Sequence, residues 1–194
     1  MCRAHARYED LVRRLAGLQD RLTPWSGTVY RNCAPRYATN ADLLGGGGST
    51  LYGGRWNPLR IRAIYASLTP ETSMAEALVE CRREGLDISD AMPRVFVAIR
   101  VDLQKMLDLT DAGIRRTLGL SVQALLEEDW RQSRASGTDA LTQSFGRAAF
   151  AAGMEGLIVP SIAIAGGRNL VVFPANLAAP SRLVIHRPDE LPGG

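Results

Sequence analysis

Residues 63–71 read Ala-Ile-Tyr-Ala-Ser-Leu-Thr-Pro-Glu, an apolar run followed at once by the start signal of a helix. The first five residues suit a buried strand. Thr69 is a hydroxyl N-cap, Pro70 stands at the first helical position, and Glu71 places an acid in the first turn. The stretch therefore predicts a strand that leads directly into a helix running to about Arg83.

Strands and helices are predicted on both sides of this stretch. Before it we expect an amphipathic helix over Tyr8–Leu22 closed by Pro24, a strand over Thr28–Cys33, and a glycine-rich loop from Ala34 to about Asn57. After it we expect a strand over Arg94–Val101, helices over Asp111–Leu118, Val122–Arg131 and Asp139–Ala152, and apolar runs over Gly156–Val159, Asn169–Phe173 and Arg182–His186. The elements do not alternate strictly, so the predicted class is α+β, with short strands in mixed sheets and flanking helices.

Length and composition are those of one globular domain. The chain has 194 residues, of which 46% are hydrophobic and 22% charged, and a chain of this length buries enough surface for its own core. No apolar run approaches the roughly 18 residues that span a bilayer. The first ten residues are too polar for a signal peptide. We therefore expect a cytoplasmic protein with no membrane contact.

The charge balance favours a small anionic ligand over nucleic acid. Basic residues number 23 and acidic residues 20, and the excess is arginine, because Lys105 is the only lysine. Arginine forks onto phosphates and carboxylates. Since the charges are spread along the chain and form no basic run, we expect no direct binding of nucleic acid.

Histidine and cysteine usage narrows the chemistry. The two histidines, His5 and His186, lie close to the chain ends, so a catalytic triad or a histidine-ligated metal would have to be built from a terminus. Cys2, Cys33 and Cys81 are far apart and odd in number, which indicates reduced thiols. Any chemistry should rest on carboxylates, arginines, tyrosines and hydroxyls, and we expect no metal.

A glycine-rich segment carries a candidate binding motif. Four glycines over 45–48 precede Tyr-Gly-Gly-Arg-Trp-Asn at 52–57. The segment lacks the lysine of a phosphate-binding Walker loop, so the glycine run itself is interpreted as a flexible loop. The arginine and the two rings that follow can hold an anionic ligand that carries a ring, because guanidinium forks onto phosphate and aromatic faces take a base or a pyridine.

Several motifs in order resemble the RES-domain family, whose members are toxins of bacterial toxin–antitoxin pairs. The matching segments are Val29-Tyr30-Arg31, Gly53-Gly54-Arg55-Trp56-Asn57, the 63–67 strand, the helix carrying Glu76, Gly156 to Ser161, and Asn169-Leu170-Val171. The resemblance implies a fold like that of ADP-ribosyltransferases, NAD⁺ as substrate, and a cognate Xre-like helix-turn-helix antitoxin. It divides the chain into an N-terminal helical extension (1–26), a RES domain (27–187) and a tail (188–194).

The resemblance also assigns site residues. Arg31 and Arg55 match the family's NAD-binding arginines, Tyr65 its site tyrosine, Glu76 its catalytic glutamate and Ser161 its C-terminal site serine. The residue types suit cleavage of the nicotinamide–ribose bond, because a carboxylate stabilises the positive charge that grows on the ribose. The resemblance implies that the arginines hold the pyrophosphate and that Ser161 also binds NAD⁺. Tyr65 would act in catalysis with Glu76 and would pack on or hydrogen-bond the nicotinamide ribose.

Each of these residues also has an ordinary structural interpretation. Glu76 lies opposite the apolar stripe of its helix, on the side of Glu80 and Arg83, which is typical of a solvated surface acid. Tyr65 suits the core and Ser161 suits a turn, while Arg31 suits an exposed or ion-paired cation. Trp56 and Trp130 are interpreted as packing residues.

Three functions stay open on the sequence. The first is a toxin that depletes NAD⁺ by hydrolysis or phosphorolysis. The second is a mono-ADP-ribosyltransferase that modifies a host protein, and the third is a nucleotide-binding domain without catalysis. The N-terminal helix could dock an antitoxin, bring two copies of the chain together as a homo-oligomer, or prop the domain.

Overall fold

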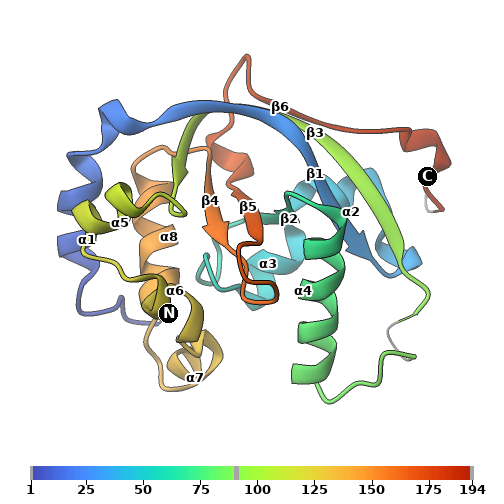
Figure 1. The fold of residues 1–194 in the computed structure, drawn as a ribbon, viewed down its shortest axis with the longest axis horizontal. Coiled ribbons are helices and arrows are strands. Elements are labelled where there is room, and N and C mark those ends of the chain that lie inside the picture. The colour runs from blue at the N-terminus through green and yellow to red at the C-terminus, as the bar shows by residue number, and fades with distance from the viewer. Residues whose placement is uncertain (1, 90–91, 193–194) are drawn as a thin grey trace.

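Two long strands pair along their length in the computed structural model, which describes residues 2–89 and 92–192 (Figure 1). Strand β1 (Thr23–Cys33) pairs antiparallel with β3 (Val95–Asp108), from Cys33 opposite Val95 to Thr23 opposite Met106. Their alternating pattern of apolar residues is typical of strands with one buried face. Both strands are longer than the sequence predicts.

Four shorter strands complete a six-stranded sheet. They are β2 (Ile64–Ser67), β4 (Gly156–Pro160), β5 (Arg168–Val172) and β6 (Arg182–Ile185). The strand order is β1-β2-β5-β4-β3-β6, and the additional pairing of β1 with β3 closes the first five strands on themselves. Only the β3–β4 pairing is parallel among the described strands. The expected mixture of short strands and helices in one domain is confirmed.

Helices cover the sheet and make one of two hydrophobic clusters with it. In this cluster α1 (Tyr8–Ala16), α5 (Ala112–Leu118) and α8 (Leu141–Ala151) bury Leu11, Leu15, Leu118 and Phe145 without exposure. The second cluster lies among the strands and includes Val29, Ile99 and Leu170. The N-terminal helix is therefore part of the main core. No helix in the described part of the chain is both long and apolar enough to cross a membrane.

Helix α4 (Pro70–Arg83) begins as the sequence predicts. The Thr69 hydroxyl accepts the N–H of Thr72 at 3.1 Å, so the start signal is confirmed. The helix is tied to β1 by the Asn32 amide, which donates to the Ser73 carbonyl at 2.7 Å. This contact holds the first turns of α4 against β1.

The first predicted helix is too long, and the strand after it too short. Helix α1 ends at Ala16, and Pro24 lies inside β1 instead of closing the helix. A register irregularity between Thr23 and Trp25 breaks the β1–β3 ladder at this proline, where its missing N–H costs no ladder bond. The helix stops at Gly17, which caps its C-terminal end, and pairing with β3 extends the strand back to Thr23.

The interpretation of the glycine run as a flexible loop is wrong. Two short helices, α2 (Asn40–Gly45) and α3 (Gly47–Tyr52), occupy this segment, and Gly46 joins them with φ of +64°. The Ser49 hydroxyl donates to the Ala63 carbonyl at 2.7 Å and accepts the Ala63 N–H at 2.8 Å. These bonds tie α3 to the strand β2.

One predicted helix is two. Residues 122–131 divide into α6 (Val122–Glu127) and α7 (Trp130–Ala135), and the Asp129 side chain caps the second helix. Shorter 3₁₀ helices occur at Gln19–Arg21, Pro35–Tyr37, Pro174–Asn176 and Pro188–Glu190. The break makes α7 a separate helix, and its residues Trp130, Arg131 and Arg134 line a cavity.

Candidate active site

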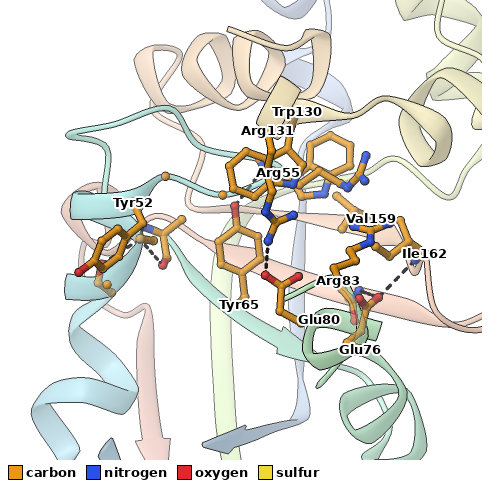
Figure 2. Close-up of a pocket in the computed structure, with 18 of the residues that line it drawn as sticks. Tyr52, Arg55, Tyr65, Glu76, Glu80, Arg83, Trp130, Arg131, Val159 and Ile162 are labelled. Atoms are coloured by element: carbon orange, nitrogen blue, oxygen red, sulfur yellow. Dashed lines mark hydrogen bonds and ion pairs between the residues drawn. The ribbon is translucent and has the colours of Figure 1, made fainter. Parts of the chain in front are cut away.

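A cavity of about 630 Å³ lies where α3, α4, α7 and the ends of the strands meet (Figure 2). This volume is typical of sites that bind small molecules. Its wall includes Arg31, Arg55, Tyr65 and Glu76, so four predicted site residues from separate segments come together. The fifth, Ser161, is not in the wall but touches Glu76 from behind.

Glu76 is held by one of its two carboxylate oxygens. Oε1 accepts the Ser161 hydroxyl at 2.6 Å, the Asn169 amide at 2.6 Å and the Ile162 N–H at 3.2 Å. No donor from the described residues lies within hydrogen-bond distance of Oε2, and no buried side-chain oxygen of the described residues lacks a partner. Oε2 is therefore open to solvent. The outer face of α4 lines the cavity, and the interpretation of Glu76 as an ordinary surface acid is wrong.

Ser161 and Asn169 act on Glu76 from the neighbouring strands. Ser161 is 5% exposed, and its hydroxyl also accepts the N–H groups of Ala163 and Ile164 at 3.0 and 3.2 Å. It is thus a turn residue that also orients the carboxylate. Asn169 in β5 accepts the Ser67 hydroxyl at 2.7 Å, so its amide group is fixed toward Glu76. The sequence points to Asn169 only as part of a family motif. Its contacts with Glu76 and Ser67 depend on the tertiary fold, which the sequence pattern does not reveal.

Tyr65 holds the glycine-containing loop against the sheet. Its hydroxyl donates to Asn57 Oδ1 at 2.7 Å and accepts the Trp56 N–H at 2.9 Å. Burial raises the pKa of Tyr65, so the phenol stays protonated and can donate. A side chain at Gly54 would collide with the Tyr65 hydroxyl, so glycine lets the loop approach this closely.

Arg55 links the same loop to the end of α6. One guanidinium nitrogen donates to the carbonyls of Leu125 and Glu128 at 3.1 and 3.0 Å. Burial, and then the positive charge of Arg83, lowers the pKa of Arg55. An arginine stays charged despite such a shift, so Arg55 brings a fixed positive charge to the wall.

Arg31 reaches the cavity from β1. Its guanidinium donates to the Leu43 carbonyl in α2, and burial lowers the pKa of Arg31. A neighbouring hollow of about 300 Å³ shares Arg31, Tyr65 and Glu76 with the main cavity. The shared residues give an extended ligand two adjoining compartments.

Helix α7 supplies residues that the motifs do not contain. Arg131 pairs with Glu80 of α4, and Arg134 donates to the Tyr52 carbonyl of α3. The two guanidinium carbons lie 4.3 and 5.7 Å from the centre of the Trp130 ring. Trp130 is 8% exposed and Trp56 is 2% exposed, in keeping with packing roles. These contacts bridge segments that are far apart in the chain.

The described residues contain no group of three or more His, Cys, Asp or Glu side chains placed to hold a metal ion. Chemistry available from the residues that are present is electrostatic: a positioned carboxylate beside several guanidinium groups. Such a wall suits a ligand that carries phosphates and develops positive charge during reaction.

Comparison with known proteins gives a consistent result. The RES domain family matches residues 28–192. Proteins named NAD(+) phosphorylase MbcT from Mycobacterium bovis and Mycobacterium tuberculosis are 31% identical over 151 residues, which cover 76% of this chain and 73% of theirs. The crystal structure of the M. tuberculosis MbcT–MbcA toxin–antitoxin complex has a chain with a TM-score of 0.71 and 27% identity, covering 96% of this chain and 98% of that one. This chain belongs to the RES-domain family.

Proposed function

We propose that this protein is a toxin that consumes NAD⁺ by cleaving the nicotinamide–ribose bond and passing ADP-ribose to phosphate or water. The observation that carries the proposal is the Glu76 carboxylate, held through Oε1 by three donors and open at Oε2 in a cavity lined by arginines. The names of the MbcT relatives point to the same reaction.

The chemistry needs little beyond electrostatics. Nicotinamide leaves as a neutral molecule, so no acid has to protonate it. Positive charge grows on the ribose carbon as the bond lengthens, and a carboxylate beside it lowers the barrier. Glu76 supplies this charge, and its three donors keep the carboxylate from turning away. No reorganisation is then needed when the charge develops.

The remaining site residues bind and position. Arg31 and Arg55 bind the diphosphate, since guanidinium groups form paired hydrogen bonds with phosphate oxygens. The Tyr65 ring packs on the nicotinamide ribose while its hydroxyl holds the loop of Trp56 and Asn57. Ser161 keeps Glu76 oriented. All four residues are carried over from the family motifs.

The proposed function also carries expectations about the fold family, the domain bounds and the antitoxin partner. We infer an ADP-ribosyltransferase-like fold, an N-terminal extension over 1–26 before a RES domain over 27–187, and a cytoplasmic setting. We also infer inhibition by a cognate antitoxin of the Xre-like helix-turn-helix type. The toxin–antitoxin complex of the structural relative supports an antitoxin partner. Purification of this chain with the product of a neighbouring gene would test the pairing.

The deciding experiment follows nicotinamide release by the purified protein supplied with NAD⁺. It is run with phosphate, without phosphate, and with cell extract. Release without extract supports NAD⁺ depletion. Release only with extract, together with a labelled protein band, would instead indicate a mono-ADP-ribosyltransferase. Binding of NAD⁺ with no release under any condition would leave a nucleotide-binding domain and overturn the proposal.

A further inference from the structure

One arginine of the cavity has no hydrogen-bond or ion-pair partner among the described residues and no role in the proposed reaction. The arginines of the wall are Arg31, Arg55, Arg83, Arg131 and Arg134. All except Arg83 are engaged by a carbonyl or a carboxylate. Across residues 2–89 and 92–192, no acceptor lies within hydrogen-bond distance of the Arg83 guanidinium. Its donors are free to bind a ligand.

The position of Arg83 brings its charge back toward Glu76. The two residues are seven positions apart on α4, which places them on one face and about 10 Å apart along the axis. Side chains in a helix lean toward its N-terminus, so the long arm of Arg83 extends back toward Glu76. Figure 2 shows the two residues on the same side of α4, near Ile162.

Arg83 and Arg55 form a pair of like charges. The positive charge of Arg83 contributes, after burial, to the lowered pKa of Arg55. Both guanidinium groups belong to the same wall, and an anion bound at Arg83 would reduce the repulsion between them. The carboxylates that share this wall are Glu76, Glu80, Glu84 and Asp42, and Glu80 is already paired with Arg131.

A phosphate acceptor needs a positively charged group with free hydrogen-bond donors, whereas a water acceptor does not. We propose that Arg83 binds the inorganic phosphate that accepts the ADP-ribosyl group. This inference rests on the proposed function and deepens it, because it assigns the choice between phosphorolysis and hydrolysis to a residue outside the family motifs. The planar guanidinium offers paired donors that match a phosphate group.

The step balances without proton transfer. The bond between the ribose carbon and the nicotinamide nitrogen breaks, and its electron pair leaves with neutral nicotinamide. A deprotonated phosphate oxygen gives an electron pair to the same carbon and forms the new C–O bond. The product is ADP-ribose with phosphate on the carbon that held nicotinamide. Attack by water would instead require a group that takes a proton.

The test compares Arg83→Gln with Arg82→Gln in the purified full chain. Arg82 is the preceding residue of α4 and is exposed, as Arg83 is, but Arg82 is not in the wall of the cavity. Initial rates of nicotinamide release are measured against phosphate and against NAD⁺, and the phosphorylated product is identified by mass spectrometry. Arg83→Gln should raise the KM for phosphate about tenfold more than the KM for NAD⁺, as expected for loss of charged hydrogen bonds. Arg83→Lys should recover part of the effect.

Four results would overturn the inference. Equal rises in both KM values would place Arg83 on NAD⁺ instead. An unchanged KM for phosphate in Arg83→Gln would remove the residue from the acceptor site. Release by the unmodified protein that ignores phosphate and gives free ADP-ribose would show that phosphate is not the acceptor, while the proposed NAD⁺ cleavage would stand. Absence of any NAD⁺ cleavage would refute both proposals.

Discussion

Glu76 is the side chain on which the proposed chemistry depends most directly. Glu76→Gln keeps an oxygen for the donors from Ser161, Ile162 and Asn169, so the fold should persist while the negative charge is lost. We expect the rate of nicotinamide release to fall about 10²- to 10³-fold or more, with NAD⁺ binding retained. The rate is checked by measuring nicotinamide in reactions quenched at set times, and NAD⁺ binding is checked by calorimetric titration.

The matched control is Glu71→Gln. Glu71 is exposed in the first turn of the same helix and does not line the cavity. It should leave the rate of nicotinamide release near that of the unmodified protein. A rate in Glu76→Gln equal to that of the control would remove Glu76 from catalysis.

Tyr65 should matter to stability as well as to the substrate. Tyr65→Phe removes a hydroxyl and leaves the Trp56 N–H and the fully buried Asn57 Oδ1 without their partner. An unsatisfied buried polar group costs about 1–3 kcal/mol, so the free energy of unfolding in urea should fall by about this amount. Tyr52→Phe, at a side chain 69% exposed, should change it by less than about 0.5 kcal/mol. Equal unfolding midpoints for the two variants would contradict this role.

At this scale the sequence predicts which residues meet but not how they are held. Motif order identifies Arg31, Arg55, Tyr65 and Glu76, and the cavity brings all four together. Helical periodicity alone places Glu76 on a solvated face, because it carries no information about the β4–β5 residues that contact this face in the fold. Arg131 lies on a separate helix, and only the tertiary fold brings it to Glu80.

The glycines of the helices separate two kinds of packing. A side chain at Gly47 in α3 meets no atom within 4 Å, whereas one at Gly146 in α8 would overlap the Trp56 carbonyl. Gly47→Ala should therefore raise the free energy of unfolding by about 0.5 kcal/mol. Gly146→Ala should lower it by about 2 kcal/mol or more, because α8 must move away from the site loop.

Thermal and urea unfolding of the two glycine variants give the comparison. A destabilised Gly47→Ala would argue against the helical conformation of α3. A stable Gly146→Ala would argue against close contact between α8 and the loop that carries Arg55.

Local signals predict elements well where tertiary pairing does not compete with them. The cap at Thr69 and the turn at Asp111 place the starts of α4 and α5, because each side chain bonds its own helix. The segment around Pro24 and the glycine run fail for the opposite reason. A partner strand draws the first into β1, and the bonds from Ser49 to Ala63 order the second.

Acid should destabilise the whole molecule. Hydrogen bonds from the Arg14 side chain, the Ser26 side chain and the Ile114 N–H, respectively, lower the pKa values of Asp10, Asp102 and Asp111. A carboxyl group with a lowered pKa in the folded state contributes stability that is fully present above its unfolded pKa, and this contribution is lost as the pH falls from that value through the lower folded pKa. The melting temperature should therefore hold near neutrality and fall below about pH 4.

Alkali should act through a different group. Burial raises the pKa of the Cys33 thiol, so its contribution is present below the unfolded pKa and is lost as the pH rises past about 8.5. Thermal melts across pH check both limits. In Asp111→Asn, which keeps the cap but not the charge, the acid decline should be shallower. An unchanged acid decline in that variant would assign the loss of stability to other carboxyl groups.

Strand β3 takes part in both hydrophobic clusters. Ile99 and Leu103 belong to the cluster among the strands, whereas Leu107 near the end of β3 and Leu109 just after it belong to the cluster under the helices. Local unfolding of either cluster would therefore disturb the same strand, and we expect the two clusters to unfold together. We therefore expect loss of activity and global unfolding to coincide.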